Sequence, residues 1–110
     1  MATKASTVEY ILEQLSSVPH VSTRKMFGEY ALYCNGRVVG LVCDDTLFIK
    51  ITEPGKRFVG EYYQEGFAYP GAKESMLIDG DRIEDQAWLS ELIQITAENV
   101  PLPKKKKPKK

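Results

Sequence analysis

The first apolar pattern in the chain has the spacing of an amphipathic helix. Its apolar residues recur at intervals of three and four, which places them on one helical face: Val8, Ile11, Leu12 and Leu15. Ser6 and Glu9 have the spacing of a capping box, in which the two side chains satisfy free backbone N–H groups. The pattern therefore predicts a helix that begins at Ser6 and ends before Pro19.

Between residues 21 and 51 the apolar pattern changes to that of β-strands. Asn35-Gly36 divides this stretch, and both residues tolerate the positive φ angles of a type I′ turn. Asp44-Asp45 marks a second turn. We expect three strands joined by two hairpins, and a bulge or sharp bend at Gly28 in the long first strand.

A second helix is predicted after Thr52, because Pro54 at a first helical position sacrifices no hydrogen bond. We expect its residues Phe58, Val59 and Tyr62 to face inward and Gly66 to end it.

The residue pattern in the last third of the chain predicts two strands and a helix. The strands are expected at residues 67–69 and 75–78, on either side of a turn at Pro70-Gly71. The helix is expected over residues 83–97, with Trp88, Leu92 and Ile95 on one face.

This order of elements predicts an α+β fold. Antiparallel hairpins separated by helices are typical of a two-layer sandwich, here with the order α-β-β-β-α-β-β-α and a five-stranded antiparallel sheet that has helices on one face. A chain of 110 residues is long enough for a single domain. We assign this domain to residues 1–100 and expect the Lys-rich residues 101–110 to form a disordered tail.

The register of the hairpins predicts which side chains share a face of the sheet. With a two-residue loop at Asn35-Gly36 and uninterrupted pairing, Glu29 lies opposite Val42. We expect helices to cover the face that carries Ala31, Tyr33, Val38, Gly40, Val42, Leu47, Ile49 and Ile51. The opposite face then carries Tyr30, Leu32, Cys34, Val39, Leu41, Cys43 and Phe48.

The second of these faces is too apolar to remain in water. Each large side chain left exposed forfeits about 1.5 to 3 kcal/mol of burial free energy. The cover is expected to be a second subunit, a partner protein, the C-terminal helix or an apolar ligand, and a protein partner or homodimer is the preferred interpretation.

The charges are distributed unevenly along the chain. Six of the 15 basic residues lie in the last seven positions, so the rest of the chain has an excess of six acidic residues. An acidic body binds nucleic acid poorly. Contact with nucleic acid is therefore expected only through the tail lysines, which are Lys104, Lys105, Lys106, Lys107, Lys109 and Lys110.

Membrane and metal partners are not expected. No apolar run approaches the roughly 18 residues of a membrane span, and the N-terminus lacks a secretory signal, so we expect a cytoplasmic protein. Two cysteines and one histidine without a C-x-x-C motif are too few for a usual metal site. No cofactor is predicted.

Catalysis is not expected either. His20 has no nucleophile or acid placed beside it by the sequence. Cys34 and Cys43 are predicted to lie about 20 Å apart along the hairpin, which is too far for a disulfide within one chain. We therefore expect two thiols and no enzyme activity.

The stretch from residue 22 to residue 36 contains the candidate binding site. Arg24 and Lys25 precede Met26-Phe27-Gly28, and Lys50 is expected on a neighbouring strand. If these cations converge beside Tyr30 or Tyr33, they form an anion site; the alternative is a bent strand with solvated cations. The candidate residues are Arg24, Lys25, Met26, Phe27, Gly28, Tyr30, Tyr33, Lys50 and Tyr69, with Asn35 and Gly36 as the turn.

Several of these residues resemble the signature of the TfoX/Sxy N-terminal domain family. The resemblance covers about residues 6–98 and consists of the following matches: Arg24-x-Met26-Phe27-Gly28, Leu32-Tyr33, Asn35-Gly36, Leu47-x-x-Lys50, Tyr69-Pro70 and Trp88. It implies the same two-layer α+β fold. Full-length members are regulators of natural competence, thought to act with the cyclic-AMP receptor protein, and they carry a second, C-terminal domain for which this chain has no room.

Three functions are consistent with these features. The first is a non-enzymatic regulatory or adaptor module that acts through protein contacts, as the resemblance and the apolar face imply. The second is a domain that binds a small anionic or amphipathic ligand between Arg24, Lys50 and the hairpin tyrosines. The third is weak nucleic-acid binding through the lysine tail.

Overall fold

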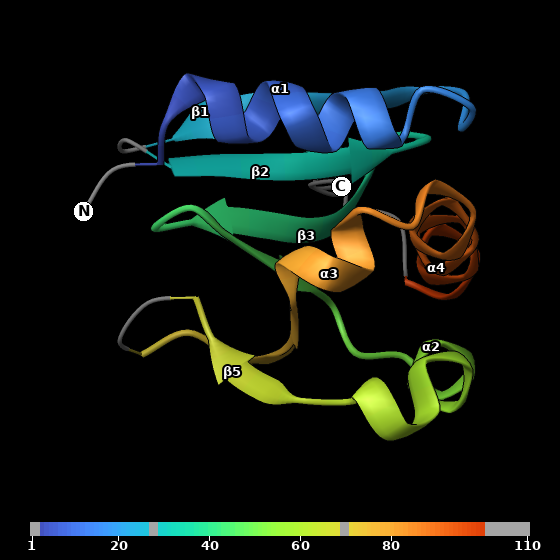
Figure 1. The fold of residues 1–110 in the computed structure, drawn as a ribbon. Coiled ribbons are helices and arrows are strands. Elements are labelled where there is room, and N and C mark those ends of the chain that lie inside the picture. Colours follow the sequence, from blue (N-terminus) through green and yellow to red (C-terminus); the bar gives the residue numbers. More distant parts are fainter. Residues whose placement is uncertain (1–2, 27–28, 69–70, 101–110) are drawn as a thin grey trace, which may run out of the picture.

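The computed structural model describes residues 3–26, 29–68 and 71–100 (Figure 1). These residues form an α+β fold. The elements are α1 (Ala5–Gln14), β1 (Val21–Met26), β2 (Glu29–Cys34), β3 (Arg37–Cys43), β4 (Thr46–Ile49), α2 (Glu53–Val59), a short 3-10 helix (Gly60–Tyr62), β5 (Glu65–Phe67), β6 (Glu74–Ile78), α3 (Gly80–Ile83) and α4 (Gln86–Asn99).

The strands form one antiparallel sheet in the order β1-β2-β3-β4-β6-β5. The sheet has six strands, and the prediction of five is wrong because residues 21–34 form two strands instead of one. β1 and β2 pair antiparallel, with Met26 opposite Glu29. The expected bend at Gly28 lies outside the described residues.

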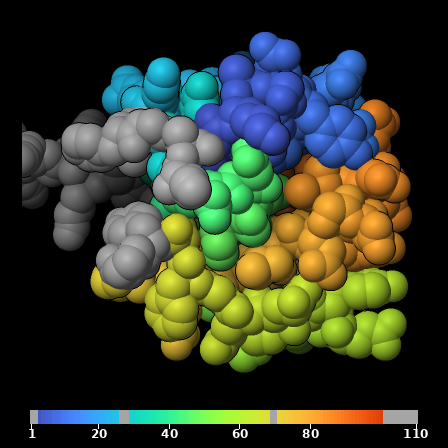
Figure 2. Space-filling model, turned by 60° about the vertical axis from the view of Figure 1, so that its left-hand side comes forward, coloured from blue at the N-terminus to red at the C-terminus, as the bar shows by residue number. Residues whose placement is uncertain are grey.

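All the α-helices pack on one face of this sheet, as predicted. In Figure 1, α1 lies over β1 and β2, and α2 lies beside α4. In the space-filling view of Figure 2, α1 (blue) lies above the middle strands (green), and the β5 region (yellow) lies below them. The largest fully buried residues come from both layers: Ile11, Leu15, Leu32, Leu47, Ile49, Met76, Leu89, Leu92 and Ile93.

Both predicted hairpin turns are confirmed. Asn35 and Gly36 have φ angles of 56° and 78°, and Asp44 and Asp45 have φ angles of 53° and 60°. In each hairpin the flanking residues pair directly across a two-residue loop. Asparagine, aspartate and glycine tolerate this left-handed conformation, so local sequence determines both turns.

A β-bulge changes the predicted register of β2 and β3. Tyr33 pairs with Val38 as expected, but Leu32 pairs with Gly40, so Val39 has no partner in β2. A bulge adds one residue to one strand and shifts all later pairs by one position. Tyr30 therefore lies opposite Val42, and the predicted pairing of Glu29 with Val42 is wrong.

The shift also corrects the predicted faces of the sheet. Leu32, Cys34 and Val39 belong to the core under the helices, and Tyr30 packs against that core. Paired residues share a face, so the face without helices carries Ala31, Tyr33, Val38, Leu41, Cys43, Phe48 and Leu77. We call these seven residues the helix-free face.

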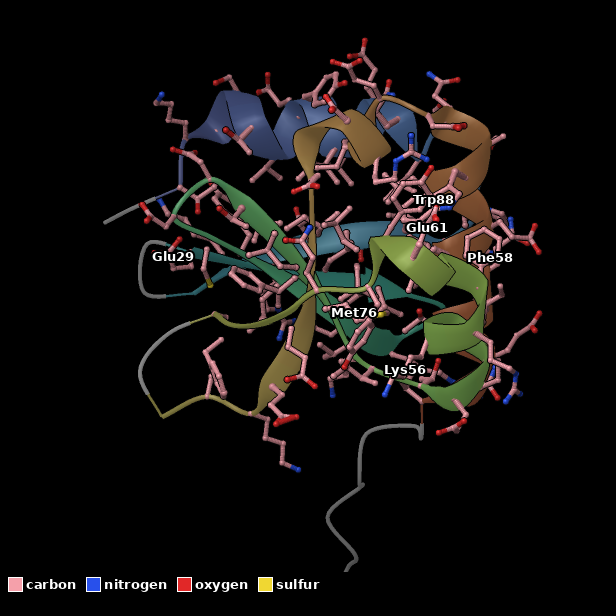
Figure 3. The ribbon with its side chains drawn as sticks, turned by 60° about the horizontal axis from the view of Figure 1, so that its bottom comes forward. Glu29, Lys56, Phe58, Glu61, Met76 and Trp88 are labelled. Carbon is pink, nitrogen blue, oxygen red and sulfur yellow. The ribbon has the colours of Figure 1, made fainter. Side chains whose placement is uncertain are left out.

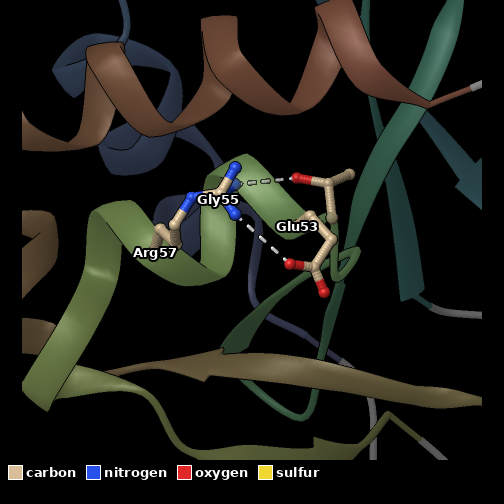
Figure 4. A network of polar contacts seen from close by, with 4 residues as sticks. Glu53, Gly55 and Arg57 are labelled. Carbon is tan, nitrogen blue, oxygen red and sulfur yellow. Dashed lines mark hydrogen bonds and ion pairs between the residues drawn. The ribbon is translucent and has the colours of Figure 1, made fainter.

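Helix α2 begins as predicted but ends earlier. The Gly55 N–H donates to the Thr52 hydroxyl at 3.0 Å, and Arg57 forms an ion pair with Glu53 (Figure 4). The helix ends at Val59, where Gly60 adopts a φ of 52°. Glycine adopts such a positive φ without the steric penalty of a Cβ atom, so the helix ends here and the assignment of its end to Gly66 is wrong.

The C-terminal helical region consists of two helices instead of one. Asp85 separates α3 from α4 and accepts a hydrogen bond from the Trp88 N–H, which caps α4. The Arg37 guanidinium donates to the Ala97 carbonyl near the end of α4. A cation at this end complements the helix dipole and fixes α4 to the β2–β3 hairpin.

Helix α1 is capped from a distant turn. The predicted capping box is wrong, because the helix begins at Ala5 and Lys4 precedes it. The Lys4 N–H and the Thr7 hydroxyl both donate to the Asp45 carboxylate at 2.9 Å. Both hydrogen bonds lower the pKa of Asp45 below its ordinary value, and the bond from the Lys4 N–H has the larger effect.

An Asp45→Asn variant is expected to melt at a lower temperature than the wild type at neutral pH. Because folding lowers the pKa of Asp45, its stabilisation is present above the unfolded pKa and disappears as pH falls through the folded pKa. The difference in Tm between the two proteins should therefore shrink as the pH falls below the ordinary titration range of an aspartate carboxyl and disappear once Asp45 is protonated in the folded protein. Thermal unfolding followed by circular dichroism measures both values.

Asp44→Asn is the matched control, since Asp44 also has a positive φ and the asparagine retains it. This variant should show no comparable loss at neutral pH. An Asp45→Asn difference that persists unchanged in acid would contradict the role of the ionised carboxylate.

Candidate functional site

The sheet divides the predicted site residues between its two faces. Arg24 and Tyr33 lie on the helix-free side, whereas Lys25 and Tyr30 lie on the helical side, opposite each other in neighbouring strands. Tyr30 is half-buried against the core. The structure therefore does not bring all these cations together beside the tyrosines, and Arg24 and Lys25 are both exposed, as in the alternative interpretation of a strand with solvated cations.

Arg24 and Tyr33 form the part of the predicted site that the structure brings together. The Arg24 guanidinium carbon lies 6.0 Å from the centre of the Tyr33 ring, at the outer limit for a cation–π contact. These residues, with Ser22 and Thr23, line a shallow hollow of about 200 Å³ at the edge of the sheet.

Lys50 lies beside a different and larger hollow. This hollow has a volume of about 520 Å³ and opens at one end of the sheet. Its lining comes from four regions of the chain and consists of Leu41, Lys50, Ile51, Thr52, Ala68, Ala72, Lys73, Glu74, Ser75, Asn99 and Val100. Neither Arg24 nor Tyr33 belongs to this lining, so the predicted grouping of Lys50 with Arg24 is wrong. We call it the Lys50 hollow.

Several predicted site residues lie outside the described part of the chain. These residues are Phe27, Gly28, Tyr69 and the tail lysines at positions 104–107, 109 and 110. Met26 is described as the last residue of β1, opposite Glu29.

The helix-free face has an apolar centre. Leu41, Phe48 and Leu77 pair side by side across β3, β4 and β6. Phe48 is only 7% exposed, because its ring lies against Gly66: a Cβ atom there would be 3.1 Å from Phe48 Cε2. Leu41 and Leu77 are only partly buried, as are Tyr33 and Val38 on the same face.

Sequence reasoning missed a cluster of aromatic residues on the helical side. The Phe58 and Trp88 rings lie 5.6 Å apart, and Tyr62 lies edge-on to Trp88 at 6.1 Å. Figure 3 shows Phe58 and Trp88 facing each other between α2 and α4. The guanidinium of Arg82 lies 4.3 Å from the Tyr62 ring centre. The only indication in the sequence was that Phe58, Tyr62 and Trp88 were each expected on the inward face of a helix.

The perturbed titratable groups are explained by local structure. Burial raises the pKa of the Cys34 thiol, and burial followed by the charges of Glu29 and Asp44 raises the pKa of Cys43. Both cysteines are free, as predicted, and both are buried. A raised pKa disfavours the thiolate, which is the nucleophilic form of cysteine.

No group of three metal-ligating side chains occurs within the described residues. The search for a helix able to cross a membrane, over the same residues, found none.

Comparison with known proteins gives two matches. The family model of the TfoX N-terminal domain matches residues 13–100, a range that includes all six strands of the sheet. A Spirochaeta aurantia protein named "Uncharacterized 12.7 kDa protein in trpE 5'region" is 38% identical over 109 residues, which cover 99% of this chain and 93% of the relative. The resemblance drawn from the motif residues is confirmed.

Proposed function

Because the chain belongs to the TfoX N-terminal domain family, we propose that it is a small non-enzymatic regulatory or adaptor module. It binds a protein, either a different protein or a second copy of itself, through the helix-free face. The observation that carries this proposal is the set of neighbouring, partly buried apolar side chains on a sheet face that no helix of the described residues covers.

The arrangement of these side chains supports binding. Tyr33 pairs with Val38, and Leu41 lies in the row that continues to Leu77, so these partly exposed apolar groups lie on one surface. Contiguous exposed apolar surface is characteristic of interaction sites. Tyrosine is enriched in the centres of protein interfaces, where its ring supplies buried area.

The charged groups at the margin would orient a partner. Arg24 and Glu29 lie on the same side of the sheet as this apolar surface. Charges around an apolar centre contribute to the association rate and specificity more than to affinity.

The polar substitution of two half-exposed residues tests the proposal. A Val38→Thr/Leu77→Thr variant keeps side chains that suit β-strands but removes apolar contact area. We expect the wild type to capture a specific protein from a native lysate or to sediment as a dimer, and the variant to lose this binding by at least about tenfold. Sedimentation and quantitative affinity capture measure the two outcomes.

Tyr10→Thr is the control, since Tyr10 is 40% exposed on α1, in the helical layer. This variant should bind like the wild type. Equal loss of binding in both variants would contradict the assignment of the surface, and a wild-type monomer that captures nothing would contradict the proposed function.

A further inference from the structure

The Lys50 hollow has the size of a small-molecule site. Its volume of about 520 Å³ lies within the range of about 300 to 1,000 Å³ that is common for ligand pockets. Two other hollows in the described structure measure about 210 and 200 Å³. The Lys50 hollow is therefore large enough for a ligand of a dozen or so non-hydrogen atoms and opens to solvent.

The floor of the hollow is apolar. Its apolar lining residues come from the strand β3, the segment after β4, the loop between β5 and β6, and the end of α4: Leu41, Ile51, Ala68, Ala72 and Val100. Val100 is only 6% exposed. Such a lining favours a ligand with an apolar body, which gains free energy when it leaves water.

The rim of the hollow is rich in hydrogen-bond donors. Lys50 and Lys73 are both exposed and line the hollow from the segments after β4 and before β6, together with the single carboxylate of Glu74. The Thr52 hydroxyl already accepts the Gly55 N–H, so its own hydrogen is free for donation. This combination favours a negatively charged acceptor.

We propose that the Lys50 hollow binds a small amphipathic carboxylate. Its apolar chain or ring lies on the floor between Leu41 and Ile51, and its carboxylate accepts hydrogen bonds from Lys50 and Lys73. This site lacks Arg24 and the hairpin tyrosines, and it shares Leu41 with the helix-free face.

Octanoate is a suitable probe, because it combines one carboxylate with a short apolar chain. We expect octanoate to shift the amide NMR signals of Leu41, Ile51 and Ala72 saturably, with a Kd below about 1 mM. Octanol and octylammonium should bind at least about fivefold more weakly, since they lack the carboxylate. Inorganic phosphate should produce smaller shifts because it gains nothing from the apolar floor.

Replacement of the two lysines tests their role. Lys50→Met and Lys73→Met should each raise the Kd for octanoate about fivefold, and the double variant should raise it further. Lys25→Met is the matched control, since Lys25 is an exposed lysine on the helical side of β1, and it should leave the Kd unchanged.

The proposal is overturned by any of three results. The first is the absence of saturable shifts at the hollow. The second is equal binding of octanol and octanoate. The third is an effect of Lys25→Met as large as that of Lys50→Met, which would indicate nonspecific attraction of the anion to surface lysines.

Discussion

A Gly40→Ala variant is expected to lose about 3 kcal/mol or more of its free energy of unfolding. A Cβ atom at Gly40 would collide with the backbone carbonyl oxygen of Phe48 and would lie 3.2 Å from the Cα atom of Ile49. Both obstacles belong to the adjacent backbone of β4, which pairs with β3 here. The methyl group therefore separates two central strands, and urea denaturation followed by circular dichroism measures the loss.

Gly80→Ala provides the control for this effect. A Cβ atom at Gly80 meets no atom within 4 Å, and its φ angle is not in the left-handed region. The substitution should be neutral or stabilise the fold by about 0.4 to 1 kcal/mol, because alanine has less conformational freedom than glycine in the unfolded chain. Similar losses in the two variants would contradict the close approach of β3 and β4.

The elements that the sequence predicts correctly are those fixed by local chemistry. Asn35-Gly36 and Asp44-Asp45 adopt positive φ angles and form two-residue turns, as their residue types require. Thr52 caps α2 because its hydroxyl lies within reach of a backbone N–H three residues later. The single-sided helical layer also follows from sequence, since each helix has one apolar face.

The errors arise where distant parts of the chain determine the structure. The sequence does not reveal the bulge at Val39, because in a continuous run of apolar residues any of them can be the unpaired one. Its consequence is large, since one inserted residue reverses the predicted faces of the β2 residues and of Val38 and Val39, while Val42, Leu47 and Ile49 lie under the helices as predicted. The cap of α1 is a similar case, because Asp45 is 41 residues from Lys4 in the chain.

The candidate site was only partly predictable for the same reason. Arg24 and Tyr33 are close because β1 and β2 pair with Ser22 opposite Tyr33. Lys50 was proposed beside them, but the sheet places β4, which Lys50 follows, three strands away from β1, and Lys50 lines the same hollow as Lys73. The second lysine arises from a segment after the predicted Pro70-Gly71 turn, and no sequence pattern connects it with Lys50.

Leu92→Ala is expected to reduce the free energy of unfolding by about 3 to 4 kcal/mol. Leu92 is 0% exposed in the middle of α4. A Cβ atom at Gly55 would lie 3.7 Å from both Leu92 Cδ1 and Met76 Cε, so Leu92 lies where α4, α2 and β6 meet. Truncation leaves a cavity among three elements, and Gln94→Ala on the exposed side of α4 should change stability by less than about 0.5 kcal/mol.

A double-mutant cycle with Met76→Ala tests whether this junction is one packed unit. Figure 3 shows Met76 in the interior of the fold, and residues that share a cavity couple by about 0.5 to 3 kcal/mol. Because the first truncation already disrupts the packing, the double variant should lose less than the sum of the two single losses. If the two single losses add to the double loss within about 0.3 kcal/mol, Leu92 and Met76 pack independently. Helix α2 would then make two separate contacts, one with each side chain, instead of packing on one shared core.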